Sequence, residues 1–97
     1  MTEAELLTKV KSGLGITGSY QDETLKIYVN EVKAFMVSAG VGQEIVDGDA
    51  SVGVIVRGVA DLWNTSSGTV GFSTYFMQRV VQLVAATTKA AAEAEVV

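Results

Sequence analysis

Apolar side chains recur at helical spacing in the second quarter of this 97-residue chain, and no proline interrupts it anywhere. The stripe runs from Leu25 to Ala39, which predicts an amphipathic helix. Acidic Asp22 lies in the first turn, where the helix dipole favours negative charge, and Gly40 is a natural terminator. Asp22 and Lys26 are four residues apart, which is the spacing of a helical ion pair. Together with the absence of proline, this segment favours a predominantly helical chain.

Another helix is predicted at the N-terminus. Thr2 and Glu5 have the spacing of a capping box, in which each side chain satisfies a free backbone donor of the other residue. Gly13 and Gly15 are expected to close this helix. Residues 43–46 are long enough for one further helical turn.

A third main helix is expected over residues 52–63, where apolar residues again recur at helical spacing. Asp47 or Asp49 is its expected N-cap. Gly53 and Gly58 lie inside the segment, although glycine costs about 1 kcal/mol relative to alanine in a helix interior. Close approach of another helix is the reason we expect for them.

The last helix begins at Ser73 or Thr74, either of which suits an N-cap. Between it and the third helix, residues 65–72 are predicted to form a flexible Gly/Ser loop or a short hairpin. The sequence thus predicts an all-α fold, a bundle of about four helices over residues 1–87. Residues 88–97 are rich in alanine and are expected to form a flexible C-terminal tail. The apolar face of the last helix consists of Phe76, Val80, Leu83 and Val84.

Composition limits the function. Hydrophobic residues make up 48% of the chain and charged residues 19%, which suggests apolar burial against a partner as well as within the core. The net charge of −4 argues against a protein that grips nucleic acid. The chain has no Cys and no His. It therefore lacks the thiolate and imidazole side chains that metal sites and catalytic sites use most often. We therefore expect a non-enzymatic domain with no cofactor, no metal and no membrane span.

Two short motifs resemble ligand sites without the context that such sites need. Residues 13–18 match the glycine pattern of a dinucleotide fingerprint, but a helix precedes them where that motif needs a strand. Asp47 and Asp49 supply only two carboxylates, fewer than a calcium loop requires. A helix connector and helix capping are the interpretations that the residues favour.

Candidate contact residues lie around the predicted loop. Arg57 and Asp61 are four residues apart on the third helix, and Arg79 lies near the start of the last one. An arginine on so apolar a helix can bond a carboxylate across an interface, and the alternative is an intramolecular or exposed pair. Aromatic residues cluster here too; most are expected in the core, and the alternative is that one or two face a partner. These are Trp63, Phe72, Tyr75 and Phe76.

The layout of residues 2–85 resembles the small head–tail connector proteins of tailed phages. The order of the segments carries the resemblance more than any chemical signature does. The segments are Leu6-Leu7 with Val10, Tyr20-Gln21-Asp22-Glu23-Thr24-Leu25, Tyr28-Val29-Asn30-Glu31-Val32-Lys33, residues 52–64 ending in Leu62-Trp63-Asn64, and Ser73-Thr74-Tyr75-Phe76 continuing to Val80.

The resemblance implies an all-helical portal adaptor at the virion neck, assembled in the host cytoplasm. About a dozen copies would form a ring beneath the portal protein after DNA packaging. The ring would extend the DNA channel, let DNA pass without specific binding, and receive a neck or tail-completion protein. It also implies subunit or channel contacts in the predicted loop, which would involve Gly68, Thr69, Val70, Gly71 and Phe72.

Two other functions remain open from the residues. A small helical assembly chaperone would have similar composition and would be absent from the finished particle. A DNA-binding regulator would need a basic recognition helix, whereas the third helix offers Arg57 against Asp49 and Asp61.

Overall fold

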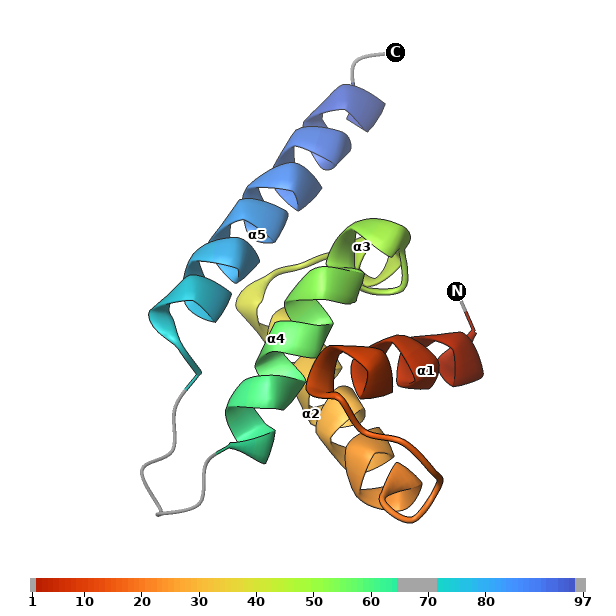
Figure 1. The fold of residues 1–97 in the computed structure, drawn as a ribbon. Helices are drawn as coiled ribbons and strands as arrows, with labels where there is room; N and C mark the ends of the chain where they lie inside the picture. The colour runs from red at the N-terminus through yellow and green to blue at the C-terminus, as the bar shows by residue number, and fades with distance from the viewer. Residues whose placement is uncertain (1, 65–71, 96–97) are drawn as a thin grey trace.

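The fold is an all-α bundle, as the sequence predicts (Figure 1). A computed structural model describes residues 2–64 and 72–95, with side chains as far as residue 92. These residues form helices only, with no strand among them. The elements in chain order are α1 (Glu3–Leu14), α2 (Asp22–Ala39), α3 (Gln43–Val46), the 3-10 turn η1 (Asp49–Ser51), α4 (Val52–Trp63) and α5 (Thr74–Glu95).

Helix α1 begins at the predicted capping box. The Glu5 amide donates to the Thr2 hydroxyl at 3.1 Å, and the Thr2 amide donates to a Glu5 carboxylate oxygen at 3.3 Å. The helix ends at Gly15, whose φ of 69° is accessible to glycine at little cost. Gly13 lies inside the helix, so Gly15 alone provides the cap.

Helix α2 has Asp22 in its first turn and ends before Gly40, as predicted, but its first turn makes a different ion pair. Gly40 ends it with a φ of 112°. Asp22 pairs with Lys11 of α1 at 2.8 Å, in place of the expected local partner Lys26. Lys11 lies in the last turn of α1 and Asp22 in the first turn of α2, so this pair holds the end of α1 against the start of α2.

The start of α4 corrects the sequence prediction. Neither Asp47 nor Asp49 caps it, because η1 comes directly before the helix and no side chain makes a capping hydrogen bond. Asp47 instead pairs with Lys33 at 3.6 Å. The Ser51 hydroxyl is fully buried and donates to the Ile45 carbonyl, which joins η1 to α3.

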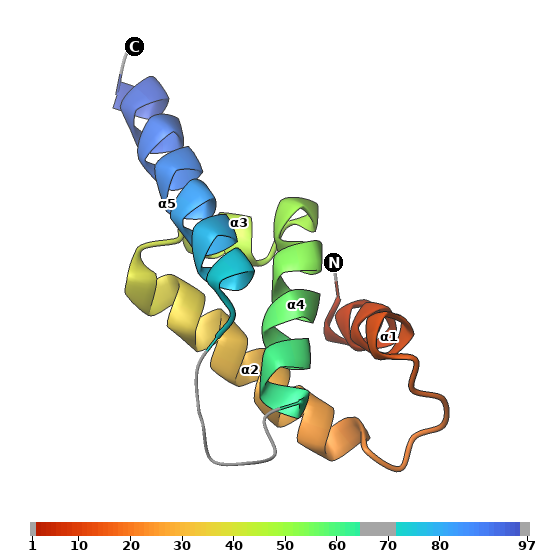
Figure 2. The same cartoon turned by 60° about the vertical axis from the view of Figure 1, so that its left-hand side comes forward.

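Helix α4 lies at the centre of the bundle and packs against α1, α2 and α5 (Figure 2). Gly58 permits a close approach to two neighbouring helices, because a Cβ there would lie 2.6 Å from the Phe76 ring and 2.9 Å from Val32. The predicted reason for this glycine is therefore confirmed. It does not hold for Gly53, which has open space around it. The buried apolar core consists of Leu6, Val10, Leu25, Val29, Val32, Met36, Val41, Val46, Val54, Ile55, Val59, Phe76, Val80 and Leu83.

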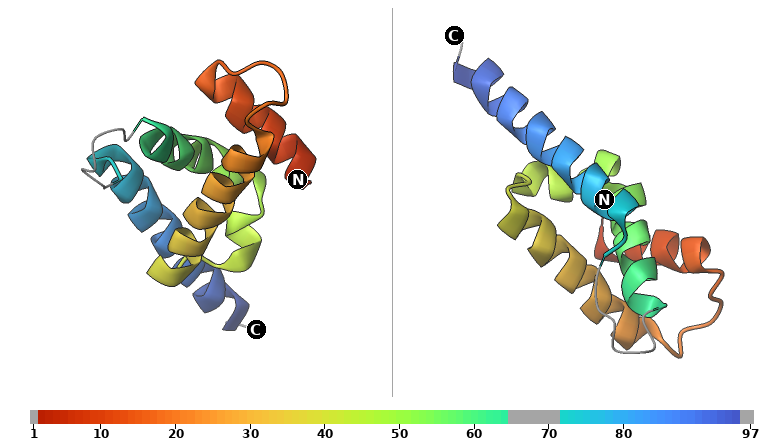
Figure 3. Two further views of the ribbon diagram at one scale, coloured as in Figure 1. Left: turned by 90° about the horizontal axis from the view of Figure 1, so that it is seen from below. Right: turned by 90° about the vertical axis from the view of Figure 1, so that its left-hand side faces the viewer.

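Helix α5 continues to Glu95, past the boundary predicted at residue 87, and the flexibility of the C-terminal tail stays a prediction. Its C-terminal half extends past the other helices (Figure 3). The Thr87 hydroxyl accepts from the Gly42 amide at 2.9 Å and donates to the Leu83 carbonyl at 2.9 Å. From residue 88 to residue 92 the side chains are exposed, which agrees with the lack of bulky apolar residues in that segment. No helix among the described residues is long and apolar enough to cross a membrane.

Gly58 and Gly53 provide a matched pair of substitutions in one helix. We predict that Gly58→Ala lowers the free energy of unfolding by about 1–3 kcal/mol, because the added methyl group overpacks the contact with Phe76. Gly53→Ala is predicted to raise it by about 0.5–1 kcal/mol, because alanine is the better helix former and meets no neighbour. Chemical denaturation measures both, and equal effects at the two positions would contradict the packing described.

The capping box gives a second prediction, on Glu5. Its side-chain hydrogen bond with Thr2, and then the backbone bond from the same residue, hold the pKa of Glu5 below its usual value. A lowered pKa stabilises the fold at pH values above the unfolded-state pKa, and this contribution is lost as the pH falls through the folded-state pKa. We predict that Thr2→Ala raises the pKa of Glu5, measured by NMR titration of its carboxyl carbon. An unchanged pKa would argue against the cap in solution.

Candidate functional site: the junction of helices α4 and α5

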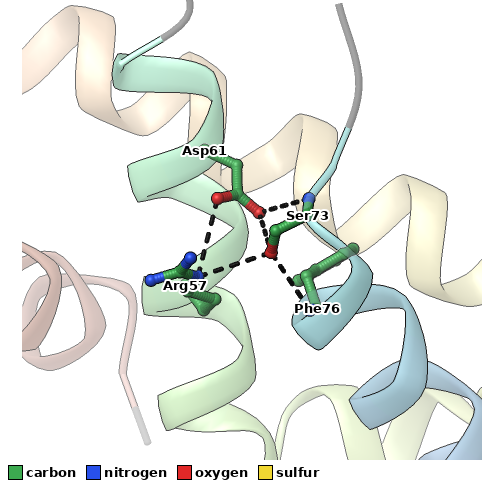
Figure 4. Close-up of polar contacts among 4 residues, drawn as sticks. All are labelled: Arg57, Asp61, Ser73 and Phe76. Carbon is green, nitrogen blue, oxygen red and sulfur yellow. Dashed lines mark hydrogen bonds and ion pairs between the residues drawn. The ribbon is translucent and has the colours of Figure 1, made fainter.

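Asp61 holds the two helices together where α5 begins (Figure 4). One carboxylate oxygen accepts from both the Ser73 amide and the Ser73 hydroxyl, each at 2.9 Å. The Ser73 hydroxyl accepts from the Phe76 amide at 3.2 Å, so Ser73 is the N-cap of α5, one of the two predicted caps. Only 12% of the Asp61 side chain is exposed. A largely buried carboxylate thus fixes the point at which the last helix starts.

Arg57 completes this junction from the preceding turn of α4. Its Nε atom lies 3.5 Å from Asp61 and 3.4 Å from the Ser73 hydroxyl oxygen. The guanidinium carbon also lies 5.9 Å from the centre of the Tyr75 ring, a distance typical of a cation–π contact. Arg57 and Asp61 therefore form an intramolecular pair in the structure, which is one of the two alternatives that the sequence left open.

Phe72 belongs to an aromatic cluster within its own chain. Its ring stacks on Phe76, with 4.3 Å between the centres, and lies 4.8 Å from Phe35. Trp63 packs edge-on against Tyr28 at 6.2 Å. Phe72 is partly buried and packs against the core of its own chain, and its place in a subunit contact or in the channel wall stays a prediction.

The remaining predicted contact residues divide into two groups. Tyr75 and Arg79 follow each other at helical spacing on α5, and Arg79 donates to Gln82. The Tyr75 side chain is 59% exposed. Four other predicted contact residues lie outside the residues that the structure describes; they are Gly68, Thr69, Val70 and Gly71.

Exposed apolar side chains mark surfaces that the sequence analysis did not select. On α2, Ile27 is 63% exposed, and on α5, Val81 is 65% exposed. Tyr20, just before α2, is almost fully exposed. An open surface region of about 380 Å³ lies beside Val81 on α5. It is lined by Thr74, Met77, Gln78, Val81 and Gln82. The available signal was that Ile27 and Val81 fall outside the buried stripes of their helices.

The arrangement at the junction positions a helix and leaves aromatic and basic groups at the surface beside it. Within residues 2–64 and 72–95, no group of three or more acidic side chains is placed to hold a metal ion. Comparisons with protein-family models, with curated protein sequences and with solved structures found no match to this chain.

The role of Asp61 can be tested by truncation. We predict that Asp61→Ala lowers the free energy of unfolding by about 1–3 kcal/mol, because the Ser73 amide and hydroxyl lose their shared acceptor. Hydrogen exchange at the Ser73 amide should accelerate at the same time. Arg57→Ala is the control and should cost less, about 0–1 kcal/mol, since half of its side chain is exposed. A larger effect at Arg57 would mean that Asp61 is not the centre of the junction.

Proposed function

We propose that this chain is a structural subunit of a tailed-phage head–tail connector. In this function about a dozen copies form a ring beneath the portal protein at the virion neck. The ring extends the DNA channel and receives a neck or tail-completion protein. The proposal rests on the resemblance of residues 2–85 to such proteins, and the all-α fold with its central α4 is consistent with it.

The observation that carries the proposal is that exposed apolar side chains occur on two separate helices. Ile27 lies on the outer side of α2, whereas Tyr75 and Val81 lie on α5. Exposed apolar surface on a small domain is typical of contact sites. A ring subunit needs two different contact surfaces, one for each neighbour, because a head-to-tail contact joins unlike patches.

The charge of the chain also suits a channel component. The net charge is −4, and DNA phosphates are negative. Like charge repels the phosphates, so DNA slides past such a wall without binding to it.

The position of α4 counts against a DNA-binding regulator. A recognition helix must present basic side chains in the major groove. Helix α4 is packed on three sides by α1, α2 and α5, and its arginine, Arg57, is paired with Asp61. These contacts favour a connector over a regulator.

Native mass spectrometry of the chain mixed with the portal protein from the same genome tests the proposed function. We predict a complex that carries about a dozen copies of the chain on one portal. If the chain does not oligomerise at high concentration and does not bind the portal, the proposed function is wrong.

Mass spectrometry of purified virions separates a connector from an assembly chaperone. The connector is predicted to be present in finished particles at a copy number close to that of the portal. Its absence from virions that were assembled in its presence would favour the chaperone.

A further inference from the structure

We propose that Arg57, Tyr75 and Arg79 form a binding site for side-chain carboxylates of an acidic segment of a partner protein. The site lies at the surface of the junction between α4 and α5. The inference goes beyond the proposed function and does not rest on it, because it concerns a property of the isolated chain in solution.

The guanidinium group of Arg57 is held along one edge only. Its contacts with Asp61 and with the Ser73 hydroxyl both use Nε (Figure 4). Within residues 2–64 and 72–95, no hydrogen bond uses its two Nη atoms, which carry the other four N–H donors. Half of the Arg57 side chain is exposed. The outer edge of the guanidinium can therefore donate two parallel hydrogen bonds to one carboxylate.

Asp61 orients Arg57 without using this outer edge. One Asp61 oxygen accepts two hydrogen bonds from Ser73, each at 2.9 Å, and only 12% of the side chain is exposed. The other oxygen lies 3.5 Å from the Arg57 Nε atom, whereas a strong charge-assisted hydrogen bond is about 2.7–2.9 Å long. The arginine is thus fixed from its inner side and presents its remaining donors to a second anion.

Tyr75 and Arg79 extend the site along α5. The Tyr75 ring centre lies 5.9 Å from the guanidinium carbon of Arg57, and this tyrosine is 59% exposed. Arg79 follows Tyr75 by four residues, so it lies about 6 Å farther along the same side of the helix. Its hydrogen bond goes to Gln82, a neutral side chain, which leaves the charge of Arg79 uncompensated by that contact. The site therefore has two cations beside one exposed aromatic ring.

The side of α4 that bears Arg57 is open to a bound segment. Gly53 and Ala60 lie on this side, at spacings of four and three residues from Arg57. A Cβ at Gly53 would meet no atom within 4 Å. Small residues on both sides of Arg57 let the backbone of a partner segment come close to the guanidinium. This access also gives Gly53 a role that packing within the chain does not.

The charge distribution favours a short acidic protein segment over DNA. Asp61 is the single acidic residue between residues 50 and 92, so two arginines face one aspartate at the site. Most of the other acidic residues precede residue 50, and the net charge of the chain is −4. A DNA duplex extends beyond the site and is repelled by this surrounding charge. A short acidic segment can bind at the arginines alone.

A titration of the isolated chain with a hexaglutamate peptide, followed by NMR, tests the site. We expect saturable shifts of the Arg57 Nε–H resonance and of the backbone amides at the start of α5. Arg57→Lys should weaken binding about fivefold, because lysine keeps the charge and loses the planar pair of donors. Arg79→Gln should weaken binding as well, since it removes the second cation.

Lys26→Gln is the matched control. It makes the same change in net charge as Arg79→Gln, and Lys26 lies on α2 beside Glu3 and Leu7 of α1, away from the site. This variant should bind the peptide as the natural chain does, and circular dichroism melting checks that every variant folds.

Three results would overturn the inference. They are the absence of a saturable shift at Arg57 in the natural chain, equal binding by the natural chain and Arg57→Lys, and tighter binding of a short DNA duplex than of the peptide. Because the titration contains no portal protein, its outcome is separate from that of the test of the proposed function.

Discussion

The close contact at Gly58 is the constraint on which the rest of the bundle depends. Without a side chain at this position, α4 can approach both Val32 of α2 and Phe76 of α5. Phe76 is fully buried and lies 5.9 Å from the Phe35 ring, so the contact at Gly58 also sets the position of the aromatic cluster. Interiors packed at this density transmit small changes in volume to their neighbours. The packing of α5 on α4 therefore depends on the absence of a side chain at Gly58.

The helices could be predicted from the sequence because their signals are local. Thr2 with Glu5, the stripe of α2 and the terminating Gly40 each act within a few residues, and the structure has them where they were expected. Contacts between distant parts of the chain could not be predicted in this way. Spacing alone favoured Lys26 as the partner of Asp22, but the fold brings Lys11 closer. The predicted cap of α4 was wrong for a similar reason. Ser51 stands at the N-cap position, and its hydroxyl donates to the Ile45 carbonyl of α3.

Part of the candidate site was also within reach of the sequence. The spacing of Arg57 and Asp61 indicated a pair, and Ser73 was recognised as a possible cap. That these three residues form one cluster depends on how the chain returns after α4, which no local pattern specifies. From the sequence, Ile27 and Val81 were detectable only as residues outside the buried stripes. The fold is needed to show that no other helix covers them.

The bond between Asp61 and Ser73 has a consequence for the engineering of this chain. It joins the last turn of α4 directly to the residue before α5, so a side-chain contact holds the start of α5 as well as the chain itself. The entropy of closing a loop grows only slowly with its length. A short affinity tag or fluorescent-dye peptide inserted within 65–71 would therefore leave the helical frame in register. Such an insertion would place a label between two helices without altering the residues of the packed core.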